Sequence, residues 1–444
     1  MTKKKVCIIG LGYVGLPMAI ALANVKKNNK FLYDVYGHDK NKKKIKNLSS
    51  GIENKQLPFD SLDKTLEQKF VYSSFKNKIN ILENLRSLTQ IDIIILSVSF
   101  DFINNKNAFR NIKSLIQQIS KFLKKGSLLL IETTLPPGTF EKILIPEINK
   151  IFLKRKISIK QISIGYSYER IMPGKNYYSS IINNFRCYSG YDEAAKKKVQ
   201  QFLKSFINYK KFPLNELNSI TECETAKILE NSYRATNIAL IDEWVNYANL
   251  LKVDLLNVIN SIKLRTTHSN IMRPGLGVGG YCLPKDGLFA EKSSKLIFKK
   301  NINFPFIKLT TKVNREMPRS SFKIIQNKIQ NLRSKQILIV GTSYKEDIDD
   351  ERNSPSLLLI KMLKKKGSKI STYDPMIDKS LMPKSNKFDI VIFCVAHDKI
   401  KKIPLKFFSK KPYYFDLNNI LDEKKISFLK KNNFKLTVLG RYYE

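Results

Sequence analysis

One cysteine of this chain lies among residue types that suit covalent chemistry. Cys282 belongs to the stretch PGLGVGGYCLPKD, residues 274–286. Four of the six residues at positions 275–280 are glycines, and Lys285 and Asp286 follow the cysteine. Glycines remove side chains, so a ligand can approach the backbone and reach the thiol. The thiolate is the nucleophilic form, and a cation such as Lys285 or Lys227 would favour it. The alternative is a tight glycine turn with an incidental thiol.

A second glycine pattern predicts a dinucleotide site. Gly10, Gly12 and Gly15 form GxGxxG between an apolar run, Val6 to Ile9, and a segment with helical periodicity. In that context the glycines allow the backbone to approach a pyrophosphate at the positive end of a helix.

Asp39 sets the expected choice of cofactor. It follows the next predicted strand, VYGHD, where an acid accepts hydrogen bonds from the adenosine ribose. A carboxylate there repels a 2′-phosphate, so NAD is favoured over NADP, although Lys40 and Lys42 weaken this preference.

The stretch IETTLPPGT, residues 131–139, ends another predicted strand with two threonines. Open α/β sheets place catalytic groups beyond the carboxyl ends of their strands, so Thr134 is positioned to orient a water or a hydroxyl. The alternative is that Thr133 and Thr134 only cap the loop.

These candidates require a scaffold in which strands and helices alternate. Apolar runs of strand length at residues 91–99 and 126–132 flank an amphipathic segment at 111–125, a pattern typical of a doubly wound parallel sheet. Residues 217–252 contain no proline or glycine and have a helical period. Strand and helix patterns then return from residue 336 onwards.

The expected fold is therefore α/β with three parts. We predict an N-terminal Rossmann-type dinucleotide-binding domain at residues 1–213, a central helical domain at 214–320 and a C-terminal Rossmann-like domain at 321–444.

Composition limits the compartment and the partners. The chain has 444 residues with 79 Lys and Arg against 38 Asp and Glu, a formal charge of +41, which raises the alternative of a nucleic-acid-binding protein. The lysines are spread along the chain without a recognisable nucleic-acid module, so a solvated basic surface is favoured. No apolar run reaches the roughly 18 residues of a membrane span. Five scattered cysteines without a CxxC pair argue against disulfides and zinc and favour the cytoplasm.

Six motifs in order resemble the nucleotide-sugar 6-dehydrogenases, the UDP-glucose and GDP-mannose dehydrogenase superfamily. They are GLGYVGL, ETTLPPGT, YERIMPG, ETAKILENSYRATNIAL, PGLGVGGYCLPKD and GTSYKEDIDDERNSP, and they span almost the whole chain. The resemblance implies oxidation of the C6 alcohol of a nucleotide sugar to a carboxylate, with two NAD and no release of the aldehyde. It also implies a homodimer through the central helices.

The resemblance implies catalytic roles. Cys282 would form a thiohemiacetal and then a thioester. Lys227 would stabilise the developing oxyanion, and Asn231, four residues on and on the same helix face, would help to hold it or an ordered water. Asp286 would act as a base or organise water, and Glu169 would act in thioester hydrolysis.

Thr134 matches the family threonine that works with Glu169. The second α/β part lacks GxGxxG, so it is expected to hold the nucleotide sugar, with Tyr344 near the base or sugar and Lys345 and Arg352 at the substrate site. Arg352 could instead pair with a nearby aspartate, Asp347 or Asp350.

The expected cofactor-binding residues are Gly10, Gly12, Tyr13, Val14, Gly15, Asp39, Ser97 and Thr134. The expected substrate-binding residues are Glu169, Arg170, Lys227, Asn231, Gly279, Tyr344, Lys345 and Arg352. No metal is expected.

Two features depart from the common family pattern. The chain has LSVSFDF where a VPTP-like loop is common, and Arg265, His268 and Arg273 all compete for the role of an arginine that reaches the neighbouring subunit's substrate. His268 could also be a loop histidine without a ligand.

The stretches ERIMPG and YKEDIDDERNSP resemble the branch that acts on UDP-N-acetylhexosamines. We therefore expect UDP-N-acetylglucosamine or UDP-N-acetylmannosamine, with UDP-glucose as the alternative, and a product used for surface polysaccharide.

Overall fold

The computed structural model describes residues 3–378, 382–383, 387–405 and 411–442. The chain forms two compact units: residues 1–229 with 289–303, and residues 230–288 with 304–444. Within these described ranges, none of the helices combines the length and the apolar character needed to cross a bilayer.

The first unit is built on an eight-stranded sheet in the order β10-β9-β8-β7-β6-β1-β4-β5. Its neighbouring strands are parallel except for β8 and β9, which are antiparallel. The strands are β1 (Lys4–Ile9), β4 (Tyr33–His38), β5 (Ile79–Ile81), β6 (Ile93–Leu96), β7 (Leu128–Ile131), β8 (Ser163–Tyr166), β9 (Cys187–Gly190) and β10 (Asn215–Glu216).

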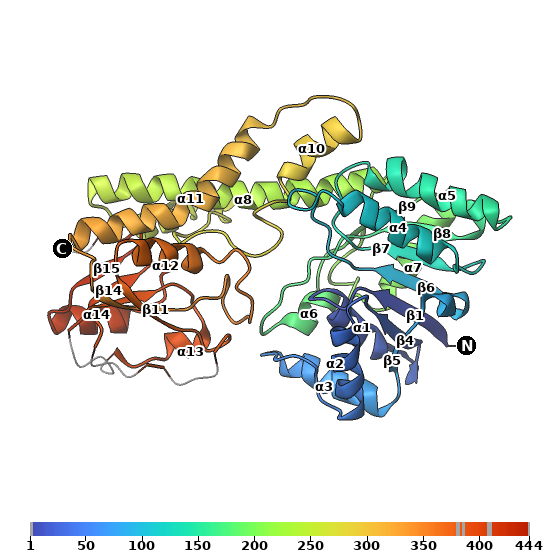
Figure 1. Cartoon of the computed structure of the whole chain (residues 1–444), viewed down its shortest axis with the longest axis horizontal. Coiled ribbons are helices and arrows are strands. Elements are labelled where there is room, and N and C mark those ends of the chain that lie inside the picture. Colours follow the sequence, from blue (N-terminus) through green and yellow to red (C-terminus); the bar gives the residue numbers. More distant parts are fainter. Residues whose placement is uncertain (1–2, 379–381, 384–386, 406–410, 443–444) are drawn as a thin grey trace. The chain divides into compact units, whose positions relative to one another are not determined.

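Both faces of this sheet are buried, which is why its central strands are continuous apolar runs. In β1, Val6 and Ile8 pack into one core with α1 (Gly15–Ala23), whereas Cys7 and Ile9 pack into another with α4 (Ala108–Ser120). Successive side chains of a strand point to opposite faces, so a strand covered on both sides must be apolar throughout. Figure 1 shows the helices around the strands of this unit.

The remaining elements of the first unit connect or cover these strands. They are the hairpin β2 (Lys26–Lys27) and β3 (Lys30–Phe31), α2 (Lys42–Glu53), α3 (Lys64–Phe75), η1 (Leu85–Gln90), η2 (Phe140–Leu144), α5 (Ile145–Lys154), η3 (Ile159–Gln161), α6 (Tyr177–Ile182), α7 (Glu193–Lys204) and most of α10 (Leu288–Leu296).

The second unit contains a five-stranded parallel sheet in the order β12-β11-β13-β14-β15. Its strands are β11 (Gln336–Val340), β12 (Lys369–Tyr373), β13 (Ile390–Phe393), β14 (Tyr413–Asp416) and β15 (Leu436–Val438). Its helical elements are α9 (Leu255–Ile262), η4 (Thr266–His268), α11 (Pro305–Lys328), α12 (Pro355–Lys365), α13 (Asp398–Lys401) and α14 (Glu423–Lys431). The long helix α8 (Ile220–Leu251) starts in the first unit and ends in the second.

The expected α/β fold class is confirmed, and the element positions follow the sequence patterns closely. The apolar run Val6 to Ile9 lies within β1, and the proline- and glycine-free segment 217–252 contains α8. The antiparallel pairing of β8 with β9 departs from the expected all-parallel sheet. An apolar run indicates that a strand is buried on both faces, but it does not indicate whether the strand is parallel or antiparallel to its neighbours.

A buried ion pair joins the ends of two strands of the first sheet. Arg186, just before β9, donates from Nη1 to Oε1 of Glu132, just after β7, over 2.8 Å, and both side chains are almost fully buried. Burial raises the pKa of Glu132, while the guanidinium of Arg186 lowers it. Removing one partner of such a pair is costly because the other charge stays buried without compensation.

We predict that Arg186→Met destabilises the protein by about 3–5 kcal/mol, because it leaves the Glu132 carboxylate buried without its cation. The double variant Glu132→Leu, Arg186→Met should recover much of this loss, since it removes both charges. Lys113→Met is the control: its partner Glu147 lies 3.8 Å away in a surface pair, so the loss should stay below about 1 kcal/mol. Urea denaturation followed by circular dichroism measures all three. Equal losses for Arg186→Met and Lys113→Met would contradict the prediction.

Candidate active site

The turn after β1 is shaped by two glycines that tolerate no side chain. Gly10 has φ = +101°, and a Cβ there would lie 2.2 Å from the carbonyl oxygen of Ser97. A Cβ on Gly15 would lie 1.9 Å from the carbonyl oxygen of Gly10. The turn therefore packs tightly against the loop after β6 and opens directly into α1.

Gly12 differs from its two neighbours because the space above it is open. A Cβ on Gly12 would meet only the Nζ of Lys44, at 4.0 Å. This opening lies at the N-terminal end of α1, where helical N–H groups and the helix dipole favour an anion. These residues fit the pyrophosphate of a dinucleotide. Tyr13, 41% exposed, and Val14, the N-cap of α1, complete the turn.

Asp39 holds this turn from the end of β4. Its Oδ2 accepts the N–H of Leu11 at 2.9 Å, and its Oδ1 accepts the N–H of Asn41 at 2.9 Å. Burial alone would raise the pKa of Asp39, but these two N–H groups and nearby Lys44 lower it below its usual value. Asp39 is therefore a carboxylate at neutral pH, the form that accepts ribose hydroxyls.

The threonines after β7 have different surroundings. The Oγ1 of Thr133 donates to the carbonyl of Leu96 at 3.3 Å and accepts the N–H of Val98 at 3.0 Å, so Thr133 ties the loops after β6 and β7 together. Thr134 is half-buried. The capping alternative thus describes Thr133, and Thr134 remains a candidate for chemistry.

In the first unit, Lys227 on α8 lies beside Glu169. Its Nζ donates to the carbonyl oxygen of Glu169 at 2.9 Å and lies 3.8 Å from Oε1 of the same residue. The ammonium also lies 5.4 Å from the centre of the Tyr168 ring. Lys227 is only 7% exposed, so its charge acts in a medium where it is worth more than at the surface.

A neighbouring acidic side chain fixes the first turns of α8. Glu224, three residues before Lys227, accepts the N–H groups of Gly138 at 2.7 Å and Phe140 at 2.9 Å. Burial raises the pKa of Glu224 to about 8, against the opposing effect of these N–H groups. Glu224 thereby joins the loop that follows Thr134 to the helix that carries Lys227. The sequence analysis did not identify it, although it lies within the motif ETAKILEN.

Arg170 is held by its own unit. Its Nη1 donates to the carbonyl of Phe185 at 2.7 Å and its Nη2 to the hydroxyl of Tyr168 at 3.0 Å. Tyr168 in turn donates to Sγ of Cys187 at 3.4 Å. Arg170 therefore fixes the segment around Glu169, in addition to any contact with substrate.

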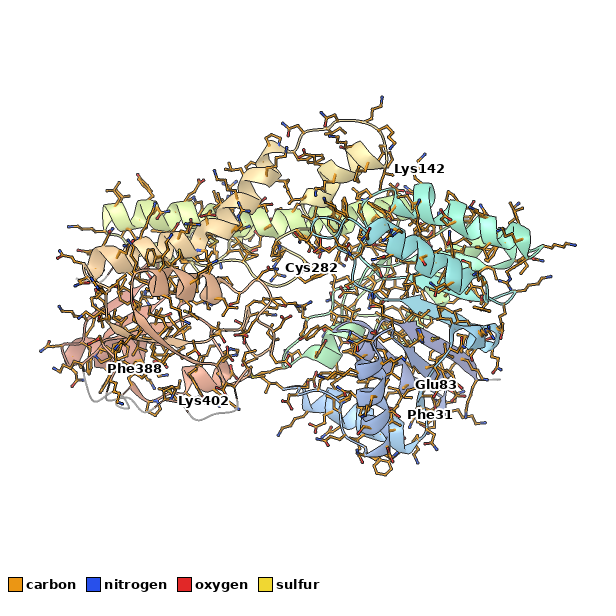
Figure 2. The ribbon with its side chains drawn as sticks, in the orientation of Figure 1. Phe31, Glu83, Lys142, Cys282, Phe388 and Lys402 are labelled. Carbon is orange, nitrogen blue, oxygen red and sulfur yellow. The ribbon has the colours of Figure 1, made fainter. Side chains whose placement is uncertain are left out.

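In the second unit, Cys282 lies on the irregular segment between η4 and α10 (Figure 2). It is half-buried, whereas the other cysteines, Cys7, Cys187, Cys223 and Cys394, are buried. Burial raises the pKa of Cys7, Cys223 and Cys394, which keeps those thiols protonated and inert. Cys282 is thus the accessible thiol of the chain.

Three polar residues form a network behind Cys282. The carbonyl of Cys282 accepts the N–H groups of Lys285 at 3.1 Å and Asp286 at 2.9 Å, which closes a tight turn. Asp286 is fully buried, and its two carboxylate oxygens accept from Nζ of Lys285 at 2.7 Å and Nδ2 of Asn231 at 2.8 Å. The Lys285 ammonium therefore forms a direct ion pair with the Asp286 carboxylate.

The glycines before Cys282 let a second loop come close, and the residue that approaches them, Tyr344, was not predicted. A Cβ on Gly280 would lie 2.7 Å from the Tyr344 ring, and a Cβ on Gly279 would lie 2.6 Å from Cβ of Tyr344. Gly280 also donates its N–H to Arg352 and accepts from Asn353, both at 2.8 Å. The expectation was that these glycines clear space for a sugar. At Gly279 and Gly280 they allow one loop to pack on another.

The loop that carries Tyr344 is fixed by a buried aspartate–histidine pair. Asp374, just after β12, accepts the N–H groups of Thr342 at 2.7 Å and Ser343 at 2.8 Å, and lies 3.1 Å from Nε2 of His397. Burial would raise the pKa of Asp374, but His397 and these N–H groups hold it well below its usual range. Nδ1 of His397 accepts the N–H of Asp347 at 2.8 Å, so Nε2 carries a proton and donates it to Asp374.

The basic candidates of the second unit differ in accessibility. Arg352 makes a short contact of 2.6 Å with Asp350, the alternative raised from the sequence, and its side chain is still 50% exposed. Lys345 is half-buried. Arg265 and Arg273 are exposed, and Nδ1 of His268 lies 2.8 Å from the hydroxyl of Thr267.

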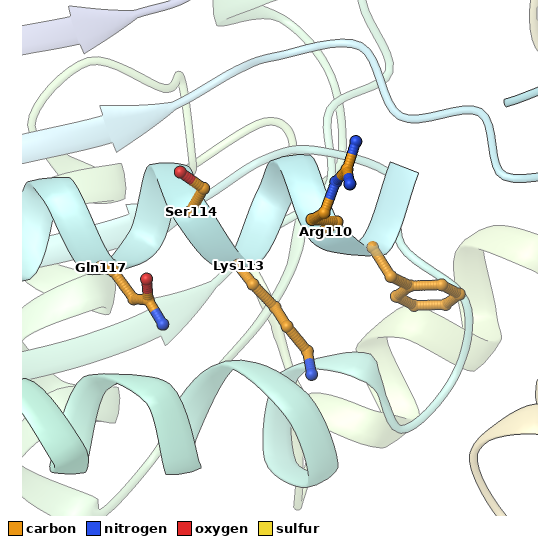
Figure 3. Close-up of a pocket in the computed structure, with 5 residues that line it drawn as sticks. Arg110, Lys113, Ser114 and Gln117 are labelled. Atoms are coloured by element: carbon orange, nitrogen blue, oxygen red, sulfur yellow. The ribbon is translucent and has the colours of Figure 1, made fainter. Parts of the chain in front are cut away.

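The hollow in Figure 3 lies elsewhere, on α4. It measures about 360 Å³ and is lined by Phe109, Arg110, Lys113, Ser114 and Gln117. Gln117 donates to Glu147 of α5 at 2.6 Å, so two lining residues serve helix packing. It contains no residue of the motifs. Among the described residues, no three His, Cys, Asp or Glu side chains are arranged to bind a metal ion.

Curated relatives match this chain along almost its full length. A UDP-N-acetyl-D-mannosamine dehydrogenase from Methanococcus maripaludis is 31% identical, over 98% of this chain and 97% of the relative. A UDP-N-acetyl-D-glucosamine 6-dehydrogenase from Pseudomonas aeruginosa is 27% identical, over 96% of this chain and 99% of the relative. A solved structure of a UDP-D-ManNAc dehydrogenase from Pyrococcus horikoshii superposes with a TM-score of 0.82 at 25% identity, covering 98% of this chain and 99% of that one.

Family models cover most of the sequence in three consecutive parts. They are the NAD binding domain, the central domain and the UDP binding domain of the UDP-glucose/GDP-mannose dehydrogenase family, matching residues 4–207, 221–316 and 338–423. The expected NAD cofactor, oxidoreductase activity and family resemblance are confirmed. The chain belongs to the UDP-glucose/GDP-mannose dehydrogenase family.

Proposed function

We propose that this enzyme oxidises the C6 alcohol of UDP-N-acetylmannosamine or UDP-N-acetylglucosamine to the carboxylate, with UDP-glucose as the alternative substrate. The observation that carries the chemistry is the accessible thiol of Cys282 beside a buried Lys285–Asp286–Asn231 network. The names of the relatives support a UDP-N-acetylhexosamine as substrate.

The first oxidation needs a base and a cation near the reacting oxygen. Asp286, oriented by Asn231 and Lys285, accepts the hydroxyl proton directly or through a water, and Lys227 stabilises the developing alkoxide. When bound, each of two NAD molecules in succession accepts one hydride from C6.

The second oxidation needs a covalent bond to the aldehyde. Sγ of Cys282 adds to C6 and forms a thiohemiacetal, which loses its C6 hydrogen as hydride and becomes a thioester. Water then adds to the thioester carbon, and the C–S bond breaks to give the carboxylate and regenerate the thiol. Glu169 and Thr134 position this water, and Lys227, held against Glu169, stabilises the oxyanion.

Substrate recognition uses residues of both sequence halves. Tyr344 and Gly279 bind near the base or sugar, Lys345 and the half-exposed Arg352 attract the diphosphate, and Arg170 acts with Glu169. Asn231 and Lys227 contact the reacting end of the sugar.

The cofactor lies along Gly10, Gly12, Tyr13, Val14 and Gly15, with Ser97 beside the turn. The ribose hydroxyls bind Asp39, which is a carboxylate at neutral pH. We propose that residues 1–213, 214–320 and 321–444 are the three functional domains of the enzyme.

We also propose that the enzyme is a homodimer that associates through α8. Tyr233, Leu240, Tyr247 and Leu251 recur at spacings of seven, seven and four residues and are each 42–63% exposed. Such spacings put them on one helix face, and a continuous exposed apolar stripe is typical of a helix interface.

Free, scattered cysteines support a cytoplasmic location. The lysine surplus is proposed to be solvated surface, so neither nucleic acid nor membrane is a partner.

We predict that UDP-N-acetylmannosamine or UDP-N-acetylglucosamine gives the highest kcat/KM in a panel of nucleotide sugars with NAD, followed by NADH absorbance. Each molecule of sugar consumed should yield two NADH, because the aldehyde stays covalently bound and is oxidised again. Fastest turnover of UDP-glucose or GDP-mannose would overturn the substrate proposal while leaving the chemistry in place.

We predict that Cys282→Ala abolishes carboxylate formation while the protein stays folded and binds NADH. The substitution removes the thiol and little volume, so the thioester cannot form. Mass spectrometry of the sugar product distinguishes aldehyde from carboxylate. Cys187→Ala, at a buried thiol, is the control and should still give carboxylate. If Cys282→Ala makes carboxylate at a near wild-type rate, Cys282 has no part in the mechanism.

We predict that Leu240→Arg with Tyr247→Arg lowers the molar mass in light scattering after gel filtration from the dimer to the monomer, because the charges disrupt the apolar stripe. Asn246→Arg adds a charge to the same helix on another exposed face and should leave the dimer intact. The proposed interface would be wrong if Asn246→Arg dissociated the dimer as much as the double variant does. It would also be wrong if the wild-type protein were a monomer.

A further inference from the structure

A lysine of α2 lies at the adenosine end of the cofactor site. Nζ of Lys44 is 3.4 Å from Oδ2 of Asp39 and 4.0 Å from the position of a Cβ on Gly12. It therefore occupies the space between the open glycine and the acid that is expected to hold the ribose. The side chain is 46% exposed, so it can move without losing much burial.

The charges around Asp39 favour an anion. Asp39 is the only acid between residues 39 and 46, and the lysines of this segment are Lys40, Lys42, Lys43, Lys44 and Lys46. The first turn of α2 contains no acidic residue, so the positive end of its dipole is not neutralised locally.

Discrimination against NADP normally rests on repulsion between the acid after the second strand and a 2′-phosphate. An ammonium within 3.4 Å of that acid offsets the repulsion. The lysine side chain is a flexible point charge, so Lys44 can pair with Asp39 when the ribose is unmodified and turn to a 2′-phosphate when one is present.

We propose that Lys44 is a specificity-determining residue of the cofactor site, which weakens the preference of this enzyme for NAD over NADP. The inference rests on the proposed contact between Asp39 and the ribose. The charges of two residues, Asp39 and Lys44, then determine how strongly the site binds a cofactor with a 2′-phosphate.

The test measures binding of NADH and NADPH by their fluorescence, without a sugar substrate. In Lys44→Ala the ratio of the Kd for NADPH to the Kd for NADH should rise about tenfold, the effect of losing one charge-assisted contact to phosphate. Lys44→Arg keeps the charge and should restore most of the wild-type ratio. Lys46→Ala removes a lysine two residues on, which points to another face of α2, and should leave the ratio unchanged.

Three results would overturn the inference. An unchanged ratio in Lys44→Ala means that Lys44 does not contact the 2′-phosphate. Equal weakening of both ligands means that Lys44 contacts a phosphate common to both. A similar rise in Lys46→Ala means that general surface charge sets the ratio. If wild type binds neither ligand, the cofactor site itself is misassigned, which separates failure of the proposed function from failure of this inference.

Discussion

Acidic side chains that accept backbone N–H groups hold the turns on which this enzyme depends. Asp39 fixes the glycine turn after β1, Asp374 fixes the turn after β11, and Glu224 fixes the loop after β7. Turns at the carboxyl ends of strands have backbone groups that no ladder satisfies, and the oxygens of one acidic side chain satisfy two of them at once. The chain has 38 acids against 79 basic residues, so several of its few acids serve this structural role.

The same arrangement connects structure to chemistry. Glu224 lies three residues before Lys227 on α8, so the contact that anchors the helix also sets where the ammonium proposed for catalysis lies. In the second unit, Asp286 is fully buried and held by Lys285 and Asn231. In each unit, hydrogen bonds to the main chain or to a neighbouring side chain therefore fix a group that we propose for catalysis before any ligand binds.

Much of this could be predicted because local pattern and motif order carry the information. Alternating apolar runs predicted the α/β fold, and GxGxxG before Asp39 predicted an NAD-binding domain in the first part of the chain. The Glu132–Arg186 pair was not predicted, because the two residues are 54 positions apart and each resembles an ordinary surface charge in sequence. The packing of Gly280 on Tyr344 was missed for a similar reason: glycine spacing does not reveal which distant side chain comes close.

Because of that packing, the loop with Cys282, residues 274–286, and the loop with Tyr344, residues 341–355, form one structural unit. Since no side chain fits at Gly279 or Gly280, any change in the shape of one loop displaces the other. A change in the loop around Tyr344, whether by evolution or by design, would therefore also shift the backbone that carries Cys282. Chimaeras between relatives of different selectivity would have to exchange residues 274–286 together with 341–355, as a single graft.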